Sequence, residues 1–181
     1  MSNAPDPTPV SPPATPKNNY AWIWFFAFII IASIGVTTFM IAYNLYIQLT
    51  PDKLESAWTK WKKDGPKSYN MVYTKRINDD SKVITYGVKV RNGKVIEVKQ
   101  DKVLLEKTKE QTEDPRIYHS MDSLFRDAER FLVLDAKPEA KRVYVMAIFD
   151  DQNGAMRYYV RRVMGGTERV ELRIELQATD D

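Results

Sequence analysis

Residue types able to do covalent or metal chemistry are scarce in this chain of 181 residues. The absence of Cys excludes disulfides, thiolate nucleophiles, Cys zinc sites and iron–sulfur clusters. The single imidazole, His119, would need a nearby nucleophile and an orienting acid to act as a general base. It directly precedes Ser120, a preferred type of helix cap, so packing or capping is the simpler interpretation. A small enzyme that uses His119 with a carboxylate stays open as an alternative.

Metal and cofactor sites are not indicated either. The segment closest to a cation loop contains Asp150, Asp151, Asn153 and Gly154. Because Ca²⁺ takes six or more oxygen ligands at regular spacing, this segment is interpreted as a turn. The chain also lacks a phosphate-binding Gly loop, a zinc-protease motif and a nucleophile elbow. We therefore expect no metal, no cofactor and no enzymatic activity.

The arginines near the C-terminus form the best candidate for a binding surface. Apolar and charged residues alternate over 168–177, which predicts a strand with one buried face. We expect the preceding strand, 156–164, to pair with it so that Val160 opposes Val170, through a three-residue connection, Met164-Gly165-Gly166. The outward face would then carry the residues that we consider for partner binding: Arg157, Tyr159, Arg161, Arg169 and Arg173.

Two interpretations of this surface remain. Guanidinium groups bind carboxylates and phosphates through paired hydrogen bonds, so the face could take an acidic protein or anionic headgroups. Alternatively, it is a solvated face whose charges promote solubility. The formal net charge of +3 is too small to indicate a nucleic-acid partner, which usually requires clustered basic residues.

A long uncharged stretch, residues 18–51, contains a predicted membrane span at 20–46. About twenty apolar residues suffice for a helix to cross a bilayer. Aromatic residues suited to the membrane interface flank the span: Tyr20, Trp22, Trp24, Tyr43 and Tyr46. The apolar run is longer than that of a cleaved signal peptide and ends without a small-residue cleavage site. We therefore expect an uncleaved signal anchor in the inner (cytoplasmic) membrane.

Three properties of the anchor are less determined. Residues 1–19 are rich in Pro and poor in groups that pack, which predicts a disordered tail. Lys17 precedes the span whereas Lys53 and Lys60 follow it, so the positive-inside count favours a cytoplasmic domain, but the rule weakens for long translocated domains. The spacing of Ser33 and Thr37 would allow two spans to pack, which is weak support for a homo-oligomer.

The remaining chain, 51–178, predicts one α+β domain. A first helix should run from Pro51, capped by Thr50, to the Gly65-Pro66 stop. Its Trp58 and Trp61 either pack on the sheet or lie at the bilayer surface. Three strands follow, with an Asn92-Gly93 hairpin turn.

Residues 101–119 predict a long connection with a short helical piece around 103–107. A second helix after Ser120 and three more strands, 142–149, 156–164 and 168–177, complete the domain. The order after the span is α-βββ-α-βββ, which indicates an antiparallel sheet covered on one face by two helices.

Several of these segments resemble a bacterial family of unknown function. The resemblance covers roughly residues 55–165 and is most specific in the hairpin Val90-Arg91-Asn92-Gly93-Lys94-Val95 and the helix start Ser120-Met121-Asp122-Ser123-Leu124-Phe125. The family is found mostly on small exported or lipid-anchored proteins. The resemblance implies a C-terminal domain outside the cytoplasm and implies no activity, cofactor or catalytic residue. Many members carry Cys after the first strand, where this chain has Lys75-Arg76-Ile77-Asn78.

Together these features predict a single-pass, membrane-anchored binding module at the cell envelope, without catalysis. Its expected partners are the lipid bilayer and an unidentified protein or envelope component. The alternatives are the small enzyme with His119 and, for a cytoplasmic domain, a nucleic-acid binder beside the membrane.

Overall fold

The computed structural model describes residues 20–78, 82–107 and 112–177. The predicted disordered tail, residues 1–19, lies outside the described residues. The chain divides into two units, Met1–Tyr43 and Asn44–Asp181, which are described separately.

The first unit contains most of one long helix, α1 (Ala21–Ile47), close to the predicted range of 20–46. Its segment Trp22–Ile47 is long and apolar enough to cross a membrane, and its most apolar part is not buried inside the protein. The side chains of Tyr20, Trp22, Trp24, Tyr43 and Tyr46, at its two ends, are all exposed. An apolar helix whose side chains are left exposed by the described residues has the properties of a lipid-facing span.

The second unit begins with the predicted amphipathic helix, α2 (Pro51–Asp64). The Thr50 side chain caps it by accepting a hydrogen bond from the Lys53 backbone N–H at 3.3 Å. One side of α2 packs against the sheet, where the Trp61 side chain is buried and stacks edge-on with Tyr69 at 5.4 Å. The apolar residues of α2 therefore pack mainly in the core of the domain.

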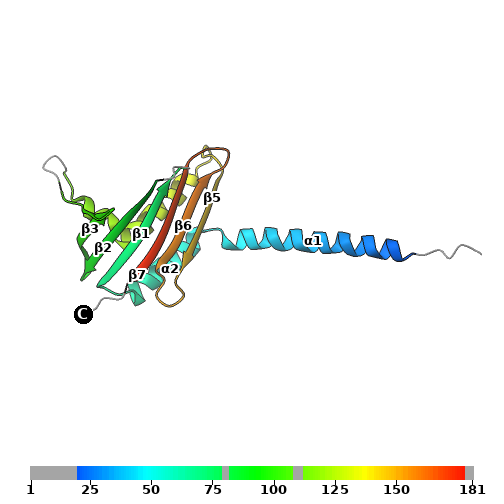
Figure 1. Cartoon of the computed structure of the whole chain (residues 1–181), viewed down its shortest axis with the longest axis horizontal. Helices are drawn as coiled ribbons and strands as arrows, with labels where there is room; N and C mark the ends of the chain where they lie inside the picture. The colour runs from blue at the N-terminus through cyan, green and yellow to red at the C-terminus, as the bar shows by residue number, and fades with distance from the viewer. Residues whose placement is uncertain (1–19, 79–81, 108–111, 178–181) are drawn as a thin grey trace, which may run out of the picture. The chain divides into compact units, whose positions relative to one another are not determined.

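Seven antiparallel strands form one sheet in the order β4-β3-β2-β1-β7-β6-β5 (Figure 1). The strands are β1 (Tyr69–Ile77), β2 (Val83–Arg91), β3 (Lys94–Gln100), β4 (Val103–Leu104), β5 (Val143–Phe149), β6 (Met156–Val163) and β7 (Arg169–Gln177). Strands β1 to β4 form one meander and β5 to β7 another, and the pairing of β1 with β7 joins them. The α+β prediction is confirmed, with one strand more than expected.

The connection between β3 and the last helix differs from the prediction. Val103 and Leu104 extend the sheet as β4 instead of starting a helical piece. The helical turn lies further on, as a 3₁₀ helix, η1 (Pro115–His119), capped by the Asp114 side chain. Pro115 at its first position explains this placement, because a proline there needs no backbone donor.

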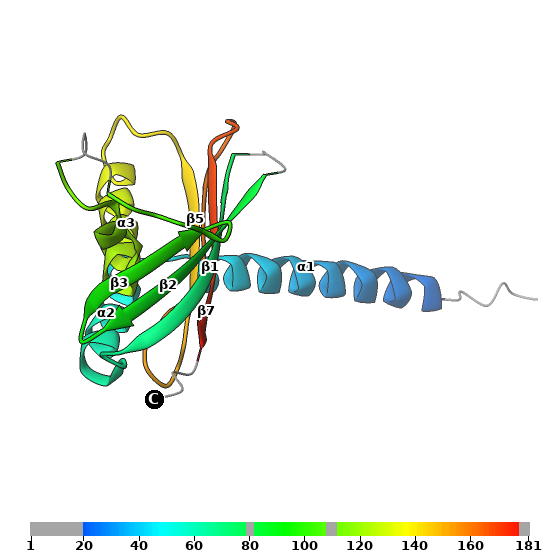
Figure 2. The same ribbon diagram turned by 60° about the vertical axis from the view of Figure 1, so that its left-hand side comes forward.

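The second predicted helix, α3 (Met121–Asp135), covers the same sheet face as α2 (Figure 2). Its cap is Ser120, whose side chain accepts from the Ser123 backbone N–H at 3.1 Å. The Tyr69 hydroxyl accepts a hydrogen bond from the Met121 backbone N–H at 3.0 Å, which fixes the start of α3 over β1. The opposite face of the sheet is left open by the described helices of this unit.

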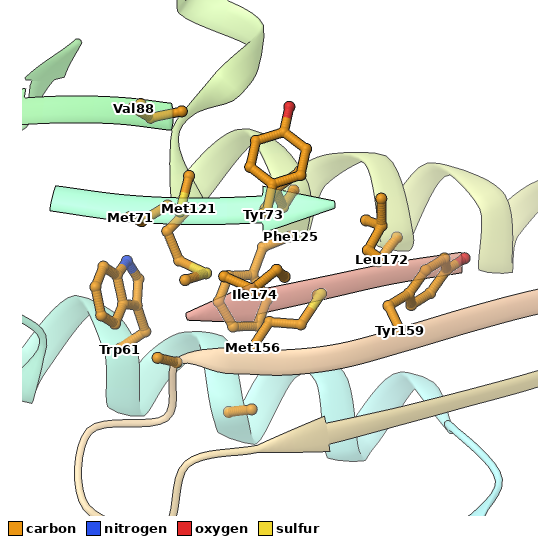
Figure 3. Close-up of a cluster of buried hydrophobic side chains, with 14 of the residues drawn as sticks. Trp61, Met71, Tyr73, Val88, Met121, Phe125, Met156, Tyr159, Leu172 and Ile174 are labelled. Atoms are coloured by element: carbon orange, nitrogen blue, oxygen red, sulfur yellow. The ribbon is translucent and has the colours of Figure 1, made fainter. Parts of the chain in front are cut away.

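The core lies between the two helices and the covered sheet face (Figure 3). Met71, Phe125 and Met156 are among its fully buried side chains. The Phe125 ring stacks between Trp58 and Phe149, at centroid distances of 5.9 and 5.8 Å. This packing fixes which side chains of each strand can reach the open face.

Candidate functional site

The register of β6 with β7 differs by one residue from the prediction. Val160 opposes Glu171 rather than Val170, and Tyr159 opposes Leu172. Val163 and Glu168 close the hairpin by a backbone hydrogen bond of 2.9 Å, so its connection has four residues, 164–167, instead of three. A shift of one residue moves every side chain of a strand to the other face.

The predicted surface is consequently divided between the two faces. Tyr159 is buried on the covered face, with 2% of its surface exposed. Arg161 lies on the same face and forms a paired contact with Asp135 of α3, at 2.8 and 2.5 Å. Its guanidinium also lies 5.0 Å from the centre of the Phe131 ring. The prediction that Tyr159 and Arg161 join the outward surface is therefore wrong.

Arg157 lies apart from the predicted residues on the covered face and from those on the open face. Phe149 opposes Met156 and Ile148 opposes Tyr158, so Arg157 is the extra residue of a bulge in β6. Its side chain pairs with Asp150 in the turn before β6. Only Arg169 and Arg173, of the five residues predicted for partner binding, share the open face.

On the open face, Arg169 and Arg173 surround a buried carboxylate, that of Glu171. Arg169 contacts it at 2.8 Å, Arg173 at 3.1 Å, and the Tyr158 hydroxyl donates to it at 3.2 Å. Burial opposes ionisation, but the hydrogen bonds and positive charges outweigh it and lower the pKa of Glu171 below its usual value. One carboxylate thus holds two guanidinium groups at the surface of the sheet.

These arginines belong to a larger basic face. By the strand registers, eight basic side chains and three acidic ones lie on the open side of β1, β2, β3, β6 and β7. The basic residues are Arg76, Lys89, Arg91, Lys94, Lys99, Arg162, Arg169 and Arg173, and the acidic ones are Glu97, Glu171 and Glu175. This basic face carries a formal charge of +5, compared with +3 for the whole chain.

A shallow hollow of about 290 Å³ lies within the basic face. Arg76, Arg173 and Glu171 line it together with Thr74 and Val83. Within the described part of the chain, Arg76 and Arg162 form no ion pair. Arginine heads that are not neutralised internally can donate paired hydrogen bonds to an external phosphate or carboxylate.

Next to the basic face, the open side of β5 and the first part of β6 are apolar. This apolar strip consists of Tyr144, Met146, Ile148, Tyr158 and Val160. Ile148 is 53% exposed.

The chain joins the domain beside this strip. Gln48 forms a bridge with Met146, and the Leu49 backbone N–H donates to the Val145 carbonyl at 2.9 Å.

His119 occupies a different place, under the covered face. The Tyr73 hydroxyl hydrogen-bonds to its Nδ1, and the Tyr86 ring lies 4.7 Å away. Burial, with a smaller effect from Lys75, lowers the pKa of His119 to about 4, so the ring is neutral at pH 7. Among the described residues, no carboxylate forms a hydrogen bond with this imidazole.

In the turn considered as a cation loop, the Asp150 carboxylate already has hydrogen-bond and ion-pair partners within the protein. The Asp150 side chain accepts from the backbone N–H groups of Gln152 and Asn153, at 2.8 and 3.3 Å, and pairs with Arg157. These contacts, the Arg157 hydrogen bond first, lower the pKa of Asp150. Across the residues described here, no group of His, Asp and Glu side chains is placed to hold a metal.

The chain was compared with family models, curated proteins and solved structures, and none of them matches. The candidate site therefore rests on geometry alone. The geometry adds Arg76, Arg162 and Tyr158 to the surface, which sequence reasoning missed because all three depend on the register.

Proposed function

We propose that this protein is a single-pass membrane protein whose C-terminal domain binds the anionic surface of the membrane that carries it. The observation that supports this most strongly is the +5 basic face next to an apolar strip whose Ile148 side chain is exposed. Basic residues beside apolar ones are the combination by which proteins bind an anionic lipid surface. The proposal includes no catalytic step.

The covalent attachment of the domain favours this partner over a soluble one. The helix α1 and the domain belong to one chain, so a membrane-spanning α1 keeps the domain close to the membrane. Such a tether raises the effective concentration of lipid at the face, and weak contacts suffice for binding. Each Arg or Lys close to an anionic surface contributes about 1 kcal/mol.

Arg76, Arg162 and Arg173 are the side chains best placed to contact lipid phosphate. The Arg173 side chain is 72% exposed although one of its nitrogens contacts Glu171. Arg169 is less available because it is more deeply buried against that carboxylate. The apolar strip would enter the interface next to them, with Ile148 as its most exposed side chain.

The experiment uses the full chain in lipid nanodiscs that contain a headgroup-attached quencher. Because the chain has no Cys, the variants Ile148→Cys and Val133→Cys each carry one fluorophore, on the open face and on α3 respectively. We expect the Ile148 label to be quenched more strongly in anionic than in neutral lipid, and the Val133 label to show no such difference. Equal quenching at both positions would exclude docking through the open face.

An acidic protein or a nucleic acid could also recognise arginines. With either partner, quenching of the Ile148 label would not depend on lipid charge. The label would instead be shielded from the quencher when the soluble polyanion is added. That outcome would replace the lipid surface as the partner while leaving the basic face as the binding site.

A further inference from the structure

A second site is present on the other side of the sheet. A cavity of about 220 Å³ lies between α3, η1 and the covered face of β1, β6 and β7. Its walls are mostly aromatic and apolar and include Tyr73, His119, Phe131, Tyr159 and Leu172. None of these residues belongs to the basic face or to the apolar strip.

One of the lining residues, Tyr159, carries an unsatisfied hydroxyl group that is hidden from solvent. Tyr159 is 2% exposed, and among the described residues its hydroxyl has no hydrogen-bond partner. In Figure 3 the hydroxyl groups of Tyr73 and Tyr159 both point out of the cluster formed by Met156 and Ile174. A buried hydroxyl without a partner costs free energy, which a bound molecule with a hydrogen-bond acceptor would recover.

The charges around the cavity favour an uncharged occupant. His119 is neutral at pH 7 and already pairs with Tyr73. The lining contains two charged residues, Lys75 and Asp127, whose charges are opposite in sign and cancel in sum. A charged ligand would therefore lose its hydration without gaining a net opposite charge.

We propose that this cavity binds an uncharged aromatic molecule of one or two rings, whose hydroxyl or carbonyl oxygen accepts a hydrogen bond from Tyr159. The cavity volume is below the usual 300–1,000 Å³ of drug-sized pockets, so a small ring system fits better than a larger ligand. The stacked rings of Tyr73 and His119, both in the lining, offer aromatic surface on one side. The inference is independent of the membrane-binding role proposed above.

The test uses phenol and benzene, which differ only in the hydroxyl group, added to the full chain in nanodiscs. The ring resonances of the single imidazole report occupancy by NMR, because His119 lines the cavity. We expect both probes to shift these resonances in a saturable manner, with phenol binding about five-fold more tightly. Tyr159→Phe should abolish the preference for phenol, whereas Tyr158→Phe, its neighbour on the open face, should retain it.

Folding does not confound this comparison. Tyr159→Phe removes only the unpartnered hydroxyl, so the variant should be at least as resistant to urea as the wild-type chain. The proposal is overturned if neither probe gives a saturable shift of His119, or if Tyr159→Phe keeps the full preference for phenol.

Discussion

At the scale of single residues, the same side-chain type serves opposite roles on the two faces of the sheet. Arg161 on the covered face is locked to Asp135, and both side chains are nearly buried. Arg173 on the open face is exposed and only partly engaged by Glu171. The sequence alone could not separate them, because each is an arginine in an alternating strand.

The Arg161–Asp135 pair should contribute to stability rather than to binding. Asp135→Asn keeps the shape but leaves a nearly buried guanidinium without its charged partner, so we expect a loss of about 2 kcal/mol in the free energy of unfolding. Urea unfolding of the full chain in detergent measures this. Glu168→Gln removes an exposed partner of Lys141 and should change the value by less than about 0.5 kcal/mol. Equal effects of the two substitutions would contradict the structural role.

His119 should make the domain less stable in mild acid. Its pKa is about 4 in the folded chain and near 6.5 when unfolded, so between these values the unfolded chain binds a proton that the folded chain does not. Stability should therefore fall as the pH is lowered from 6.5 towards 4, by about 1 kcal/mol for a ring that is only partly shielded from solvent. In His119→Gln this part of the pH dependence should disappear. An NMR titration giving a pKa above 6 would contradict the burial of the ring.

At the scale of elements, local sequence signals were sufficient for the helices and the tight turn. Thr50, Pro51 and Gly65 define α2, and Ser120 begins α3, as their capping chemistry predicts. Asn92 and Gly93 have positive φ angles of 51° and 75°, as the predicted hairpin turn requires. These features depend only on neighbouring residues, so one sequence suffices to locate them.

The register of β6 was not predictable in the same way. Apolar residues occupy both alternating sets in this strand, with Tyr158 and Val160 on one face and Tyr159 and Val163 on the other. The bulge at Arg157 and a connection one residue longer than expected decide between the two sets, and both depend on tertiary packing. The candidate site depends on this register, so only Arg169 and Arg173 were placed correctly.

The turn between β5 and β6 depends on Gly154 to reach α2. Gly154 has a φ of +75°, and an added Cβ would lie 2.4 Å from the Ala57 carbonyl oxygen. Gly154→Ala should therefore cost about 3 kcal/mol or more, from backbone strain together with displacement of the turn from the helix. Gly165 has the same φ but open space around it, so Gly165→Ala should cost only about 1 kcal/mol. Urea midpoints that are equally lowered in both variants would contradict the close contact with α2.

At the scale of the whole molecule, charge and apolar surface are distributed unevenly. The open face carries more positive charge than the entire chain, so the rest of the chain is slightly acidic in sum. Net charge alone gave no indication of this, because opposite charges elsewhere cancel most of the excess. The basic face emerges only when the strand registers assign each residue to a side of the sheet.

The side of the membrane on which the domain lies follows, in our proposal, from the resemblance to exported and lipid-anchored proteins. We expect a C-terminal tag to be digested by external protease in cells with a permeable outer layer. A cytoplasmic protein assayed in the same cells should stay intact, as the control for membrane integrity. Protection of the tag would instead support the cytoplasmic topology favoured by Lys53 and Lys60.

The central claim is that the basic face, and not the net charge, holds the domain at an anionic membrane. We would compare two triple variants with equal loss of charge, both with the Ile148→Cys label in quencher nanodiscs. The open-face variant removes three basic charges from the basic face, with Arg76→Gln, Arg162→Gln and Arg173→Gln. The helix variant removes three basic charges from α2, from α3 and from the segment just after α3, with Lys63→Gln, Arg130→Gln and Lys137→Gln.

The open-face variant should lose the extra quenching in anionic lipid, equivalent to about 3 kcal/mol of binding for three guanidinium groups. The helix variant should keep it. Equal loss in both variants would contradict the claim, since it would show that total charge alone governs the position of the domain.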